Sequence, residues 1–120
     1  MTNKEKRSLI EKIKNINKSP IVTTVTETGL VDELLKIEDS VLILANQLYV
    51  SDFNSMNITH STIIIDNFYR SSFDVQQKII SQILDNVWEN KTLVIIDYTN
   101  DENYTTIFDA AILNRCILLN

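Results

Sequence analysis

The chain has 120 residues, 44% of them hydrophobic, and a formal net charge of −5. This length predicts one domain with its own core, and the hydrophobic share excludes a wholly disordered chain. One cysteine, Cys116, excludes an internal disulfide, and no apolar run reaches the ~20 residues that span a bilayer. We therefore expect a cytoplasmic protein in a reducing compartment, without a secretory signal.

Positive charge is concentrated in residues 1–18, where we expect an amphipathic helix running from a cap at residue 2 or 3 to about residue 17. Six basic residues outnumber two acidic ones there, so this segment carries +4 and the rest of the chain −9. An acidic body is a poor surface for nucleic acid, so only the basic segment could contact it. The simpler interpretation of that segment is a solvated helix face.

The predicted elements then alternate between strand and helix. We expect strands at residues 21–26, 41–45, 62–66, 92–97 and 116–119, from their β-branched and apolar runs. We expect helices at 30–37, from a cap at residue 71 or 72 to about 89, and from a cap at 105 or 106 through 113. The polar, Asn-rich stretch 47–61 predicts a short crossover helix around 48–57. This alternation predicts one α/β domain over residues 1–120, with a mostly parallel five-stranded sheet between two helical layers.

Two of these strands end in a carboxylate, Thr62–Asn67 at Asp66 and Leu93–Tyr98 at Asp97. With the elements in this order, residues 9–119 resemble the base domain of AAA+ ATPases, and clamp-loader subunits in particular. Thr62–Asn67 is similar to the Walker B strand, and Leu93–Tyr98 is similar to the sensor-1 strand. Asn114–Cys116 is similar to the Ser-Arg-Cys motif. The resemblance implies a P-loop NTPase-like sheet of order 5-1-4-3-2. It also implies that Arg115 reaches a neighbouring subunit; the simpler interpretation of Arg115 is a salt bridge at a helix C-terminus.

The residues that would bind ATP depart from that family's pattern. The phosphate loop corresponds to Thr26–Val31, which keeps one glycine, has Leu30 in place of the lysine and adds the charge of Glu27. Asn67 replaces the catalytic glutamate, and Asp97 replaces a neutral sensor residue and would repel a γ-phosphate. We also expect the helical lid to be missing. We therefore predict a degenerate site with no catalytic residue and no cofactor.

The carboxylates leave one alternative open. In the implied strand order Asp66 and Asp97 lie side by side, with Asp101 and Glu102 in the adjoining loop, and oxygen ligands suit Mg²⁺ or Ca²⁺. The simpler interpretation is that each carboxylate accepts hydrogen bonds from loop N–H groups or faces water. His60 has neither a second histidine nor a nearby cysteine, so a zinc site is not supported.

Two functions follow as hypotheses. The first is a non-catalytic interaction or assembly module, as a homo-oligomer or as the partner of another protein such as an AAA+ or replication machine. Aromatic residues in the predicted loops, Tyr49 among them, favour a protein interface if exposed, whereas Phe73 and Trp88 have the helical spacing of core residues. The alternative is a small metal-dependent enzyme or cation-binding domain that uses the acidic edge.

Overall fold

The computed structural model describes residues 2–15, 21–24, 30–56, 58–85, 87–88, 90–97 and 117–119. For residues 21–24, 69, 97 and 117–119 it describes the backbone. The predicted helix that starts at 105 or 106, Cys116 and most of the loop Thr26–Val31 lie outside the described residues. No helix within the described ranges is long and apolar enough to cross a membrane.

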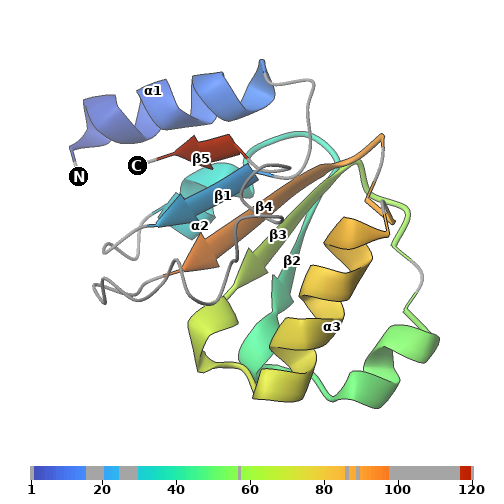
Figure 1. Cartoon of the computed structure of the whole chain (residues 1–120). Helices are drawn as coiled ribbons and strands as arrows, with labels where there is room; N and C mark the ends of the chain where they lie inside the picture. The colour runs from blue at the N-terminus through green and yellow to red at the C-terminus, as the bar shows by residue number, and fades with distance from the viewer. Residues whose placement is uncertain are drawn as a thin grey trace.

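Five strands form one parallel sheet (Figure 1). They are β1 (Ile21–Thr24), β2 (Ser40–Leu44), β3 (Thr62–Asp66), β4 (Thr92–Asp97) and β5 (Ile117–Leu119). Their order is β2-β3-β4-β1-β5, and each neighbouring pair is parallel. Counted from the other edge, this is the order 5-1-4-3-2 given above. The predicted α/β class and parallel sheet are therefore confirmed.

Helices cover both faces of this sheet, because successive strand residues point to opposite sides. Ile63 and Ile65 of β3 lie in a core cluster with α3 (Phe73–Leu84), which covers the face toward the viewer in Figure 1. Ile64 lies in a second cluster with α1 (Asn3–Lys14) and α2 (Leu30–Leu34). In Figure 1, α2 lies behind the sheet. Both central strands are buried on both faces, which explains their unbroken apolar runs.

Both long helices begin at a hydroxyl cap. The Thr2 hydroxyl oxygen accepts a hydrogen bond from the Glu5 N–H at 3.1 Å, and the Ser72 hydroxyl oxygen accepts one from the Val75 N–H at 3.2 Å. Each cap satisfies an N–H group that has no partner within its helix. The caps agree with the predicted starts of both helices.

Several predicted elements differ from the structure, and α1 ends at Lys14 rather than near residue 17. Instead of a crossover helix at 48–57 there are two 3-10 segments, η1 (Ala45–Gln47) and η2 (Val50–Asn54). The Asp52 carboxylate accepts a hydrogen bond from the Tyr49 N–H at 2.7 Å and caps the start of η2. Helix α2 ends at residue 34 rather than 37. Helix α3 ends at Leu84 rather than near residue 89. Just after this end, in a turn, the Val87 N–H donates a hydrogen bond to the Gln82 carbonyl.

Asp39 joins the beginnings of β2 and β3. Its backbone is left-handed (φ 59°), and its carboxylate accepts hydrogen bonds from the Ser61 hydroxyl at 2.7 Å and the Ser61 N–H at 3.0 Å. The Ser61 carbonyl in turn accepts from the Thr92 N–H at 2.9 Å, which extends the connection to β4. These hydrogen bonds lower the pKa of Asp39, and the one from the Ser61 hydroxyl has the larger effect. Desolvation raises the pKa, and the charges of His60 and Lys91 lower it slightly.

This network predicts a dependence of stability on pH. Because the pKa of Asp39 is lower in the folded than in the unfolded chain, its ionised form stabilises the fold above the ordinary pKa, and that contribution is lost as pH falls through the lowered value. Asp39→Asn keeps tolerance of the left-handed backbone and removes the charge. In thermal melts from pH 7 downward, the variant should be less stable than the parent at pH 7, and this difference should shrink as the pH falls below the ordinary value of 3.8. Parallel curves would contradict this.

Candidate functional site

The carboxyl ends of β3 and β4 bring the two predicted acidic residues to one edge of the sheet. The register pairs Ile65 with Ile95, so Asp66 is level with Ile96 and the backbone of Asp97 lies one residue further along. Asp97 pairs in turn with Thr24 of β1. The structure therefore places both residues at the ends of neighbouring strands, as the sequence predicted.

The Asp66 carboxylate is turned toward its own backbone. The residue is 8% exposed, and Oδ1 accepts a hydrogen bond from the Asn67 N–H at 2.8 Å. Asn67 itself has a left-handed backbone (φ 58°, ψ 32°), which asparagine tolerates better than most residues. It precedes the 3-10 segment η3 (Phe68–Arg70). Here Asp66 and Asn67 form a turn, and the neutral amide of Asn67 has no basic site for accepting a proton.

The cation alternative gains no geometric support from these residues. In the parts of the chain that the structure describes, no group of three or more His, Cys, Asp or Glu side chains could hold a metal ion. Asp101, Glu102 and Arg115 lie outside those parts, as does the side chain of Asp97. The cation site at Asp66 and Asp97, and the subunit contact of Arg115, stay predictions.

Leu30 occupies the position that the resemblance assigns to the phosphate-binding lysine. It is the first residue of α2 and is 0% exposed. Its neighbours in the buried cluster come from α1 and from both central strands, Ile13, Ile64 and Val94 among them. The side chain at this position is therefore part of the hydrophobic core, where an ammonium group would lose its water without gaining a phosphate partner.

The basic face of α1 is solvated. Leu9, Ile10 and Ile13 are buried, as the amphipathic pattern predicts, and the exposed Lys14 pairs with Glu11 at 3.7 Å across one helical turn. Such exposed pairs contribute little to stability. The structure thus fits the simpler interpretation of this segment, and nucleic-acid contact through it stays a prediction.

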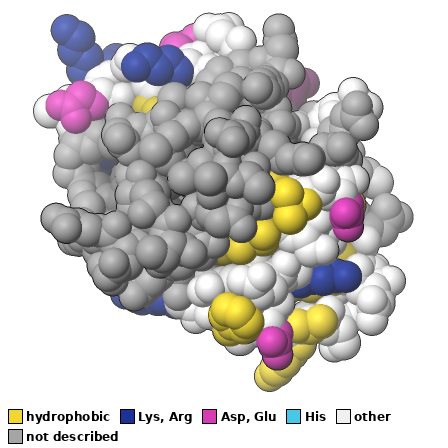
Figure 2. Space-filling model, in the orientation of Figure 1, with side chains coloured by type: hydrophobic (Ala, Val, Ile, Leu, Met, Phe, Trp, Pro, Cys, Tyr) yellow, Lys and Arg dark blue, Asp and Glu magenta, His cyan; other side chains and the backbone are white. Residues whose placement is uncertain are grey.

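Two aromatic side chains stand out from the surface around α3. Tyr49, beside η2, is 76% exposed, and Phe73, the first residue of α3, is 71% exposed. The core position predicted for Phe73 is wrong: the buried residues of α3 begin at Val75, and Phe73 is exposed in the first turn. Figure 2 shows hydrophobic side chains gathered on the surface at the lower end of α3.

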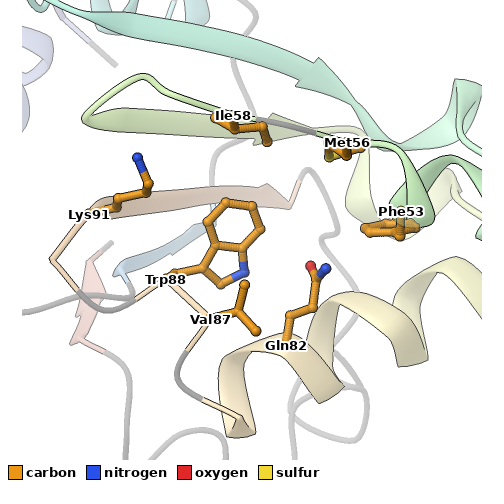
Figure 3. A pocket seen from close by; sticks show the side chains of 7 residues that line it. All are labelled: Phe53, Met56, Ile58, Gln82, Val87, Trp88 and Lys91. Atoms are coloured by element: carbon orange, nitrogen blue, oxygen red, sulfur yellow. The ribbon is translucent and has the colours of Figure 1, made fainter.

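A pocket of about 210 Å³ lies beside the C-terminal end of α3 (Figure 3). Ile58 and Lys91 line it and precede β3 and β4, so it is near the amino ends of these strands, whereas Asp66 is at a carboxyl end. Its walls come from η2, the loop before β3, the turn after α3, and Lys91 just before β4. The core position predicted for Trp88 is confirmed, because the side chain is 7% exposed. The pocket itself was missed, because it depends on how α3 ends and on the 3-10 geometry of η2.

Comparisons with known proteins support the fold. No protein-family model matches the sequence, and no curated protein is similar to it in sequence. A DNA polymerase III gamma subunit-related protein of Thermotoga maritima matches 96% of this chain with 45% of its own, at 11% identity and a TM-score of 0.51. The Holliday junction branch migration motor RuvB of the same organism matches all of this chain with 46% of its own, at the same identity and TM-score.

These similarities show an AAA+ or P-loop-like α/β fold. At 11% identity they show the fold alone, and this chain spans less than half the length of either structure. Fold is also a weak guide to activity, because one scaffold carries many functions. Any role for this chain therefore has to come from its own side chains.

Proposed function

We propose that this chain is a protein-interaction module that assembles with copies of itself, built on an AAA+-like fold that neither binds nor hydrolyses ATP. Burial of Leu30 is the observation that carries the loss of the nucleotide site. A phosphate loop requires backbone N–H groups and a lysine directed at the phosphates. Here the corresponding side chain points into the core.

Asn67 supports the same proposal from the neighbouring strand. It stands where the resemblance expects the glutamate that activates water, and an amide is not a base. Its left-handed backbone starts the turn that buries Phe68, so the position is used for folding. A lost lysine and a lost base together remove both phosphate binding and water activation.

The exposed side chains support an interface. Tyr49 and Phe73 are among the largest apolar side chains on the described surface. Tyr49 comes just before η2, which contacts α3, and Phe73 is the first residue of α3. Aromatic residues are enriched where proteins contact each other, and lysine and glutamate are depleted there. Monomeric proteins rarely gather large apolar side chains on one face. We therefore place the self-association surface on the α3 side of the molecule.

Sedimentation velocity over a range of protein concentrations tests this surface. We expect the parent chain to associate as its concentration rises. The double variant Tyr49→Ser/Phe73→Ser should stay monomeric up to a concentration at least about tenfold higher, because central aromatic contacts each contribute ~2 kcal/mol or more. Both side chains are exposed, so its melting temperature should change little. Leu35→Ser is the matched control, because Leu35 is 40% exposed and follows α2 on the other face of the sheet.

Two outcomes would contradict the proposed surface. A parent chain that is monomeric at every concentration would remove self-association altogether. Equal loss of association in the double variant and in Leu35→Ser would show that general surface hydrophobicity, rather than the α3 side, drives it.

A further inference from the structure

The pocket beside α3 contains two buried polar atoms of complementary character. Among the residues that the structure describes, the Trp88 Nε1–H donor and the Gln82 Oε1 acceptor have no hydrogen-bond partner. Figure 3 shows the indole nitrogen on the side of the ring that faces Gln82. Native proteins pair more than ~90% of their buried polar groups, because an unpaired one costs free energy. Two such atoms lining one pocket point to a missing partner.

The rest of the lining is mainly apolar. Phe53, Met56 and Ile58 form one side, and Val87 and the Trp88 ring lie across from them (Figure 3). The cationic Lys91 is already engaged, because its Nζ donates to the His60 carbonyl at 2.7 Å. The occupant must therefore be mostly apolar and carry one acceptor next to one donor.

We propose that this pocket binds a small neutral molecule carrying a lactam group. The lactam oxygen accepts the hydrogen bond of Trp88 Nε1–H, and the adjacent N–H donates to Gln82 Oε1. The ring carbons fill the space between Phe53, Ile58 and Val87. A carboxylate of the same size would satisfy Trp88 but would bring a charge into a mainly apolar pocket whose cation, Lys91, is already engaged. At about 210 Å³, the pocket is smaller than the ~300–1,000 Å³ of sites for drug-sized ligands, so a single ring fits it.

This site goes beyond the proposed function and does not depend on it. It lies at the amino ends of the strands, whereas ligands of open parallel α/β sheets bind at the carboxyl ends. It also uses neither Leu30 nor the exposed aromatics. A failed test of the lactam site therefore leaves the proposed function unchanged.

Trp88 makes the test direct, because it is the chain's one tryptophan and lies in the pocket wall. We would titrate the protein with δ-valerolactam, which does not absorb where tryptophan is excited, and follow the emission of Trp88. A saturable change is expected. N-methyl-δ-valerolactam lacks the N–H donor and should bind about tenfold more weakly, because it leaves Gln82 Oε1 unpaired. Pentanoate should also bind about tenfold more weakly, because its charge loses water without gaining a cation.

Gln82→Leu should also weaken δ-valerolactam binding about tenfold, because the lactam N–H then has no acceptor. This variant keeps the fluorescent Trp88. Gln77→Leu is the matched control: it is the same substitution on an exposed residue of α3, and binding should be unchanged. A melting curve for each variant checks that it is folded, and the comparison of the two lactams in the parent chain needs no variant.

Three outcomes would overturn the proposal. No saturable change in the parent chain would show that water fills the pocket and satisfies both atoms. Equal binding of the two lactams would show that Gln82 does not accept the N–H. Tighter binding of pentanoate would show a site for an anion instead.

Discussion

Replacing Leu30 by lysine is expected to destabilise the protein by at least about 3 kcal/mol and to create no affinity for ATP. The leucine is 0% exposed and lies in the buried cluster that joins α2 to α1 and the central strands. The substitution removes its apolar contacts and buries an ammonium group that must either lose its water or lose its proton. Against a typical total stability of ~5–15 kcal/mol, such a loss leaves a marginal or unfolded chain.

Urea unfolding measures this loss, and two variants calibrate it. Leu30→Met keeps the volume and apolar character and should cost less than ~1.5 kcal/mol. Leu35→Lys introduces the same charge at a 40% exposed position and should stay within ~0.5 kcal/mol of the parent. If Leu30→Lys were as stable as Leu35→Lys, the leucine would not be core. A rise in melting temperature with ATP in Leu30→Lys would show that a phosphate site persists there.

Phe68→Ala is expected to lose about 3–5 kcal/mol, the cost of deleting a large aromatic side chain from a closed core. Phe68 is fully buried and lies in the cluster that joins α3 to the sheet. The segment that carries it, η3, also packs against η1 and the end of β4. The cavity left by alanine would therefore lie between η3, η1 and β4. These elements are held by the sheet and cannot move far enough to close it fully.

The matched control for this variant is Phe73→Ala, which removes the same atoms from an exposed position five residues later. It should change the free energy of unfolding by less than ~0.5 kcal/mol. Phe68→Leu should fall between the two, because it keeps most of the apolar volume. Similar losses for Phe68→Ala and Phe73→Ala would contradict the burial described for these residues.

The sequence predicted the central strands well because their signal is strong. Residues 62–66 and 92–97 are unbroken β-branched and apolar runs, which fits strands covered on both faces. It placed Phe73 wrongly, because helical spacing shows which residues share a face but not where the first turn meets the sheet. Phe68 was missed as a core residue, because it lies in a turn after Asn67, where no periodicity applies.

The candidate sites were predictable to different degrees. The meeting of Asp66 and Asp97 at one edge follows from strand order, which the alternation of elements already suggests. The pocket at Trp88 and Gln82 was not predictable, because it forms where α3 ends early and where Met56 and Ile58 line its other side. Such contacts depend on tertiary packing, and helix ends are set by competing hydrogen bonds that a propensity pattern does not contain.

Thermal unfolding with Mg²⁺–ATP tests most directly whether this AAA+-like fold has lost its nucleotide site. A dissociation constant of about 50 μM would, at about 5 mM ATP, add ~2.7 kcal/mol of stability and raise the melting temperature by roughly 10 °C. We predict a shift of less than about 1 °C relative to Mg²⁺ alone. Mg²⁺ alone, compared with a chelated sample, tests the cation alternative at Asp66 and Asp97. A rise of several degrees that requires ATP and saturates with its concentration would contradict the proposed function.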